Sequence, residues 1–208
     1  MSIVKLNNNG VKNATSFGSA SSGSMTFIKK LTASSSSTLS FVDGSSDVIL
    51  DNTYKEYLFT FKNIHPSAEA NFTFQGNAVG GSGYNETITS TSFDAFNREN
   101  GEQQAVNYNG GGDQAQGTSF QILNYDAPIE NDNDSCLGGY LHLFNPSSTT
   151  FVKHFIARTQ HMGISSNALS HDNFCAGYFN TTSAIDEIQF KMSSGNIDAG
   201  DICLYGIN

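Results

Sequence analysis

Segments of alternating apolar and polar residues run through most of the chain, and the clearest pair flanks a polar turn. Over Tyr140–Phe144 two leucines alternate with polar or aromatic neighbours, and the alternation resumes over Phe151–Arg158. Side chains switch faces at each residue of a strand, so a period of two predicts β-strands. Asn145-Pro146 begins the turn, because proline fixes φ and has no N–H to give to a sheet. We therefore predict a β-hairpin here.

A hairpin that folds symmetrically about Ser148 places His142 opposite His154. Two imidazoles that face each other on neighbouring strands can share a metal ion. Such a site needs a third ligand, which only His161 or His171 in the following polar segment offers. Two polar residues at a sheet surface or a subunit contact are the simpler interpretation, and we favour it.

The same alternation predicts further strands on both sides of this hairpin. Lys29 interrupts the first of them, which indicates an edge strand or a bulge, since charge protects sheet edges. One segment also fits helical spacing, with Ser183 and Asp186 placed as a capping box, but we predict a strand that forms a C-terminal hairpin with the last one. The expected strands are Ser24–Thr32, Leu39–Val42, Tyr54–Ile64, Asn71–Gln75, Glu86–Phe96, Phe120–Ile122, Phe174–Phe179, Ala184–Met192 and Asp201–Ile207.

Two long polar breaks, Asn97–Gly117 and Thr159–Asp172, are predicted to be loops. A long loop inside a compact domain is often functional. Ten to twelve short strands with no convincing helix predict an all-β fold, namely a jelly-roll-like antiparallel β-sandwich. The residues expected to face its core are Tyr57, Phe59, Phe61, Phe72, Phe74, Leu141, Leu143, Phe190 and Leu204.

The first 23 residues differ from the rest, because they have too few apolar residues to fold alone. We expect an extended N-terminal arm over residues 1–23 and a β-sandwich domain over residues 24–208. A disordered tail is the alternative. If the arm orders on a partner, its docking anchors are Ile3, Val4, Leu6, Val11 and Phe17.

Composition and charge narrow the function classes. Among 208 residues there are sixteen Phe, eight Tyr, twenty Gly and no Trp, and the formal net charge is −9. Ten Lys and Arg argue against a nucleic-acid partner, because phosphate binding needs clustered cations. No apolar run approaches the roughly 20 residues that span a bilayer, so we expect no membrane insertion. The first residues lack the apolar core of a secretory signal, which favours synthesis in a cytoplasm.

Motifs for catalysis are absent, so we expect the protein not to be an enzyme. There is no G-x-S-x-G elbow, and the glycines at 110–112 lack the lysine of a phosphate loop. The three cysteines are widely spaced, as is typical of reduced structural thiols. We expect no cofactor, except that Glu130, Asp132 and Asp134 alternate in one loop and offer oxygen ligands for a structural calcium ion. A solvated acidic loop is the simpler interpretation.

Four stretches carry a resemblance to a known family: MTFIKKLTASSSSTLSFVDGSS, NTYKEYLFTFKNIHPSA, LFNPSSTTFVKHFIAR and TTSAIDEIQFKMSSGNIDAGDICLYGI. Together they resemble small virion structural proteins of marine tailed phages, notably those that infect cyanobacteria and pelagic bacteria. The resemblance covers about residues 24–208 and rests on structural motifs. It implies a tail, fibre or capsid-decoration protein, made in the host cytoplasm and located in the virion.

Two functions therefore compete. The first is a non-enzymatic virion structural protein for assembly, surface display and host attachment. It would dock to other virion proteins through the arm and form a homo-oligomer, most simply a homotrimer. The alternative is a lectin-like carbohydrate-binding module for host-surface glycans, with Tyr84, Tyr108 and Tyr125 in place of the missing tryptophans.

Overall fold

The structure, a computed structural model, describes residues 24–164 and 168–208. The expected arm, with Ile3, Val4, Leu6, Val11 and Phe17, lies outside the described residues. The described part of the chain forms thirteen β-strands and no helix. They are β1 (Met25–Thr32), β2 (Leu39–Val42), β3 (Glu56–Pro66), β4 (Phe72–Ala78), β5 (Ile88–Arg98), β6 (Gln104–Tyr108), β7 (Ala115–Gly117), β8 (Gln121–Ile122), β9 (Leu137–Phe144), β10 (Lys153–Ile164), β11 (Ala168–Phe179), β12 (Ile185–Met192) and β13 (Ile197–Ile207).

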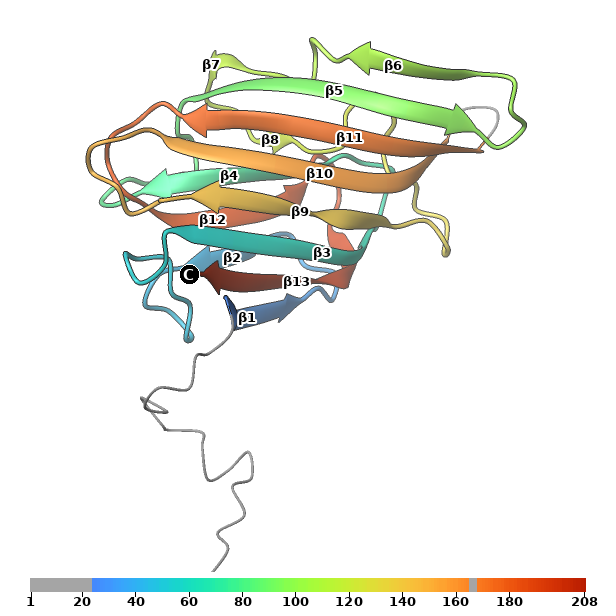
Figure 1. The fold of residues 1–208 in the computed structure, drawn as a ribbon. Helices are drawn as coiled ribbons and strands as arrows, with labels where there is room; N and C mark the ends of the chain where they lie inside the picture. The colour runs from blue at the N-terminus through green and yellow to red at the C-terminus, as the bar shows by residue number, and fades with distance from the viewer. Residues whose placement is uncertain (1–23, 165–167) are drawn as a thin grey trace, which may run out of the picture.

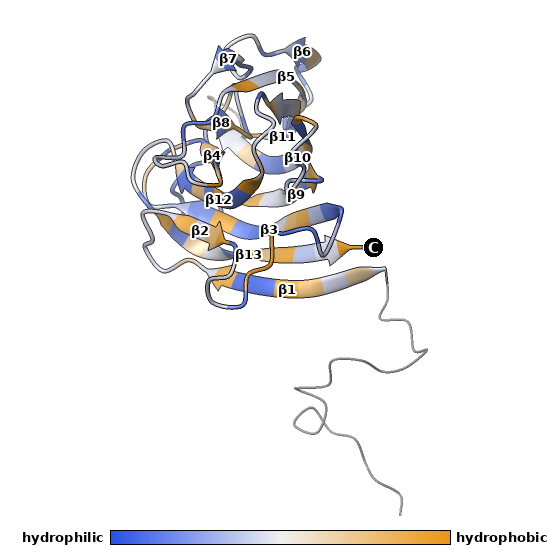
Figure 2. Ribbon diagram, turned by 90° about the vertical axis from the view of Figure 1, so that its left-hand side faces the viewer, coloured by the Kyte–Doolittle hydropathy of each residue, from blue (hydrophilic) through white to orange (hydrophobic). Residues whose placement is uncertain are grey.

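The strands form two antiparallel sheets that pack face to face (Figure 1). The large sheet has nine strands in the order β1-β13-β3-β9-β10-β11-β5-β6, with β7 beside β5. The small sheet has four, in the order β2-β12-β4-β8. Figure 2 shows the small sheet on one side of the large one. The predicted all-β sandwich is confirmed.

The apolar core lies between the sheets, and Phe190 of β12 is at its centre. Its ring centroid is 5.4 Å from those of Phe59 and Phe61 on β3, and 5.6 Å from that of Phe72 on β4. Aromatic pairs of this kind contribute about 0.5–1.5 kcal/mol each beyond the burial of their area. All nine predicted core residues are buried, as expected: Tyr57, Phe59, Phe61, Phe72, Phe74, Leu141, Leu143, Phe190 and Leu204.

Two further local predictions are confirmed. β1 is an edge of the large sheet, and its register with β13 shifts between Phe27 and Lys29, so the strand is both an edge and bulged. The segment with mixed helical and strand signals is β12, a strand. Its alternating Ile188, Phe190 and Met192 are buried against the core, which outweighs the local capping signal.

The prediction that the two long polar breaks are loops is wrong. Asn97–Gly117 contains β6 and β7, and Thr159–Asp172 belongs largely to β10 and β11. β6 is an edge strand with no buried face, so it carries no apolar alternation. In β10 and β11 the alternation exists, but the inward residues are polar: Thr159, His161, His171 and Asn173 are all buried.

The predicted C-terminal hairpin is also wrong, because β12 lies in the small sheet and β13 in the large one. The connection between them crosses from one sheet to the other. β3 does not end at Ile64, as expected, but continues through His65 and Pro66. The sheet tolerates Pro66 because β3 and β13 pair irregularly there, with a register shift beside the Ile197–Pro66 pair.

Replacing Phe190 tests the importance of the aromatic core. Phe190→Ala should lower the free energy of unfolding by about 3–5 kcal/mol, because it leaves a cavity among rings that cannot close in. Phe151→Ala is the control, since Phe151 is 68% exposed, and should change it by less than about 0.5 kcal/mol. Urea denaturation measures both. Equal effects in the two variants would contradict this account of the core.

The three cysteines should differ in reactivity. All are free thiols, and Cys136 is partly exposed while Cys175 and Cys203 are buried. Burial raises the pKa of Cys175 to about 12, and only the thiolate reacts. We expect a thiol reagent to label one cysteine in the native protein and all three after denaturation. Cys136→Ser should abolish the native reaction, and rapid native labelling of this variant would refute the assigned burial.

Candidate functional site

The small sheet covers only part of the inner face of the large sheet. We call β5, β6, β7, β10 and β11 the sheet extension; these strands lie beyond β9 in the large sheet. The connection between β8 and β9 covers part of their inner face. The Thr159 hydroxyl donates to the Leu123 carbonyl at 2.5 Å, and Ile129 forms an isolated bridge to Gly163. The outer face carries exposed apolar side chains such as Phe93, Tyr108 and Ile156.

A row of aromatic side chains crosses the outer face. Tyr140, Arg158, Phe174, Phe93 and Tyr108 occupy neighbouring positions on β9, β10, β11, β5 and β6. We call these five residues the aromatic row. The rings of Phe93 and Phe174 stack at 4.7 Å, and the Arg158 guanidinium lies 4.7 Å from the centre of the Phe174 ring. Cross-strand contacts of this kind hold the side chains in one arrangement.

The aromatic row is exposed, and its one charged member is paired. Tyr108 is 62% exposed, Phe93 43% and Tyr140 39%. Arg158 donates from Nε and a terminal nitrogen to both oxygens of Asp172, at 2.9 and 2.6 Å, and this pair raises the pKa of Arg158. An exposed apolar patch of this extent commonly marks a binding surface.

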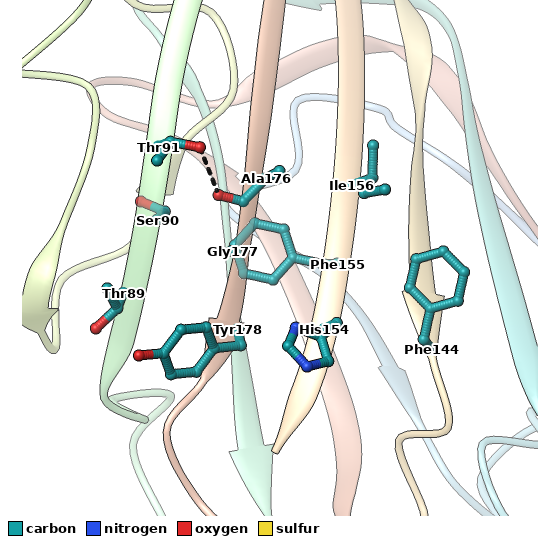
Figure 3. A pocket seen from close by; sticks show the side chains of 10 residues that line it. All are labelled: Thr89, Ser90, Thr91, Phe144, His154, Phe155, Ile156, Ala176, Gly177 and Tyr178. Carbon is teal, nitrogen blue, oxygen red and sulfur yellow. Dashed lines mark hydrogen bonds between the residues drawn. The ribbon is translucent and has the colours of Figure 1, made fainter. Parts of the chain in front are cut away.

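Two hollows lie on the same outer face. The larger, of about 450 Å³, is lined by strand residues of β5, β9, β10 and β11, with the rings of Phe144, His154 and Tyr178 around it (Figure 3). The smaller, of about 310 Å³, is lined by Gly138, Gly139, Tyr140, Arg158, Gln160 and Asp172. The smaller hollow is therefore lined by Tyr140 and Arg158 of the aromatic row, together with the polar side chains of Gln160 and Asp172.

The predicted facing of His142 and His154 is wrong. His142 pairs with Ile156, so the hairpin register is two residues from the symmetric one. An even shift keeps every side chain on its predicted face, and both histidines remain on the outer face. The His142 ring lies 4.2 Å from the Phe144 ring, tilted by 34°, and its Nε2 is 3.0 Å from the Glu56 carboxylate. His142 and His154 thus lie diagonally across the β9–β10 pair and not directly opposite each other.

Neither expected third ligand can reach this histidine pair. His161 and His171 lie in β10 and β11 and are buried on the inner face. Within residues 24–164 and 168–208, no group of metal-ligating atoms includes His142 or His154. The simpler interpretation, polar residues on a sheet surface, fits this placement.

The calcium site expected at Glu130, Asp132 and Asp134 remains a prediction. Asp132 and Asp134 are exposed, and desolvation followed by the charges of Asp132, Glu69 and Asp134 raises the pKa of Glu130. These carboxylates therefore repel one another. Across the described residues, their ligand atoms do not form a metal-sized group.

The three tyrosines proposed for sugar binding are not in one place. Tyr108 belongs to the aromatic row, and its hydroxyl donates to Asp113. Tyr125 packs against Gly111 and Gly112, in the loop between β6 and β7 that also holds Asp113. Tyr84 lies apart, near Ser40 and Glu187, where burial raises the pKa of its hydroxyl to about 12.

A buried polar cluster lies under the sheet extension, on its inner face. His171 Nε2 donates to Asp94 at 2.7 Å, and His161 Nε2 donates to the Ala127 carbonyl at 2.8 Å. The two imidazole rings are 5.3 Å apart. Burial, and then the neighbouring His171, lower the pKa of His161 to about 4, so this imidazole is neutral near pH 7.

One group in this cluster has the geometry to hold a metal. Atoms of Asp94, Asp126 and His171 lie within 4.8 Å of one another, the single such group in the described chain. A hollow of about 320 Å³ adjoins it, lined by Asp126 and His171 together with Phe96, Arg98, Gln103, Ala105, Asn107, Ala127 and Leu169. The sequence pattern indicated His171 only as a third ligand for His142 and His154. It gave no indication that Asp94 or Asp126 would be a ligand.

Comparisons with known proteins found no relative of this chain. The chain matches no family model, no curated protein and no solved structure. Over the part of the chain that the structure describes, no helix is long and apolar enough to cross a membrane. The function must therefore be argued from the residues.

Proposed function

We propose that this protein is a non-enzymatic structural protein of a phage virion, associated with the tail or fibre or decorating the capsid. Its outer face, centred on the aromatic row, packs against a second copy of the chain, and the N-terminal arm docks to other virion proteins. The resemblance of residues 24–208 to virion proteins motivates the proposal. The exposed aromatic row is the observation that carries it.

The strand order supports the jelly-roll interpretation on which this proposal draws. Without the sheet extension, eight strands remain, which are β1, β2, β3, β4, β8, β9, β12 and β13. Numbered one to eight along the chain, they form sheets in the orders 1-8-3-6 and 2-7-4-5, all antiparallel. Jelly rolls of eight strands occur in viral capsid and lectin domains. The fold alone does not distinguish a capsid function from a lectin function, so the argument must rest on the surface residues.

The surface favours contact between copies of the chain. A sheet face in water is normally polar, yet this one carries four aromatic rings, on β9, β11, β5 and β6, of which Phe93 and Phe174 are stacked. The chain has a net charge of −9, which opposes association through most of its surface. On the aromatic row, Arg158 is paired with Asp172, so the one charged member of the row is neutralised. Symmetric repetition of one contact also suits a virion part.

Oligomeric state tests this proposal. The full-length protein at micromolar concentration should have a light-scattering mass that is a multiple of 22.3 kDa, three chains for the expected homotrimer. Phe93→Lys combined with Tyr108→Lys should give the single-chain mass, because it places charge in the contact. Val79→Lys, at a 59% exposed position that follows β4 of the small sheet, should leave the oligomer intact. A wild-type protein that stays at 22.3 kDa would sink the proposed contact.

A lectin-like function is the second candidate, and the smaller hollow favours it. Tyr140 gives this hollow an exposed aromatic side, while Arg158, Gln160 and Asp172 offer hydrogen-bond donors and acceptors beside it. Sugar rings bind to such combinations because they have apolar faces and polar edges.

A glycan array separates the two candidates. If the protein binds host glycans at this hollow, Tyr140→Ala should abolish array binding, and Phe151→Ala, also at an exposed position, should not. Binding that survives Tyr140→Ala would place any glycan site elsewhere. Absence of saccharide binding together with an oligomer that the Phe93 and Tyr108 variant dissociates would leave only the structural role.

A further inference from the structure

The buried carboxylate of Asp94 is only half satisfied. Asp94 is fully buried on β5, and its Oδ2 accepts the hydrogen bond from His171 Nε2. Its Oδ1 and the Nδ1 of His171 are also buried but have no hydrogen-bond partner. A buried charged oxygen without a partner is costly, so natural proteins rarely keep one without a ligand, ion or water to satisfy it.

Asp126 is held beside this unsatisfied pair from a different part of the chain. It lies in the connection between β8 and β9, where its backbone has a φ of +79°. The next residue, Ala127, is anchored through its carbonyl oxygen, which accepts from His161 Nε2 at 2.8 Å and from Asn124 Nδ2 at 3.3 Å. The carboxylate of Asp126 is therefore brought to Asp94 and His171 by contacts that do not involve its own side chain.

The geometry points to a site for a divalent first-row transition-metal ion, of the Zn²⁺ class, ligated by Asp94, Asp126 and His171. Nothing in the proposed function requires this site, which lies on the opposite face of the sheet from the aromatic row. The ion joins β5, β11 and the connection between β8 and β9, and so fixes that connection against the sheet extension.

The distances suit an ion of this size. In a tetrahedral site, bonds of about 2.0–2.2 Å place two ligand atoms of one ion about 3.3–3.6 Å apart. Asp94 Oδ2 and His171 Nε2 are 2.7 Å apart through a proton that the ion displaces, so they separate slightly on binding, and all three ligand atoms lie within 4.8 Å of one another. Asp126 is exposed, so a small rotation of its side chain completes the approach.

The ligand set selects the class of metal. One imidazole and two carboxylates suit Zn²⁺, Mn²⁺, Fe²⁺ or Co²⁺, whereas Ca²⁺ prefers six to eight oxygen ligands and Mg²⁺ keeps most of its waters. Three protein ligands leave a tetrahedral ion one open position. That position faces the polar hollow lined by Arg98, Gln103 and Asn107.

Metal binding by the full-length protein, first freed of metal with a chelator, tests the site. Titration with ZnCl₂, MnCl₂, CaCl₂ and MgCl₂ should show one Zn²⁺ per chain by elemental analysis after gel filtration, with a higher melting temperature. Asp126→Asn should weaken Zn²⁺ binding about tenfold or more, because it removes a ligand. This variant should fold normally, because Asp126 is exposed.

Asp132→Asn is the matched control, since it removes an exposed carboxylate from the neighbouring loop. It should bind Zn²⁺ as the wild type does. His171→Gln should also lose the ion, with circular dichroism to check that it folds. The assignment is overturned if the wild type takes up no transition metal, if it binds only Ca²⁺, or if Asp126→Asn binds Zn²⁺ as tightly as the wild type. Asp94 and His171 are then only a buried hydrogen-bonded pair.

Discussion

The small sheet is too small to cover the inner face of the large one, and the character of each part of the molecule depends on this mismatch. Four strands, one of them only two residues long, face nine. Where the sheets overlap, aromatic rings pack into an apolar core around Phe190. Under the sheet extension, a connecting segment supplies part of the cover, and its backbone carbonyls must be hydrogen-bonded. Polar inward residues such as Thr159 and His161 provide those bonds.

This difference explains where the sequence could be interpreted and where it could not. β3 and β12 were predicted with their correct faces, because their inward residues are apolar and their outward ones polar. The same alternation in β10 and β11 has Thr159, His161 and His171 inside, which is typical of a loop when burial is unknown. Local rules tend to fail at functional or strained sites, and here they failed at the buried polar cluster.

The sites were harder to predict than the strands because they depend on pairing between distant segments. The hairpin of β9 and β10 kept its predicted faces although its register differs by two residues, since side chains repeat every second position. That same shift separates His142 from His154. Asp94, Asp126 and His171 come from three segments far apart in sequence, and the aromatic row comes from five strands. No spacing within the sequence carries such information.

The central claim is that the part of the sheet extension around Thr159, His161 and His171 is held by polar contacts to a covering segment. The rest of the sandwich, including Phe155 and Phe179 of β10 and β11, is held by an apolar core. Native-state hydrogen exchange of the metal-free protein tests it most directly, because it reports the opening free energy of each strand. The account predicts that amides of β3, β12 and β13 exchange only with global unfolding, and that those beside the buried polar cluster, at 94–98 of β5 and 168–173 of β11, exchange through a separate opening of lower free energy. Equal protection in both groups of amides would contradict it.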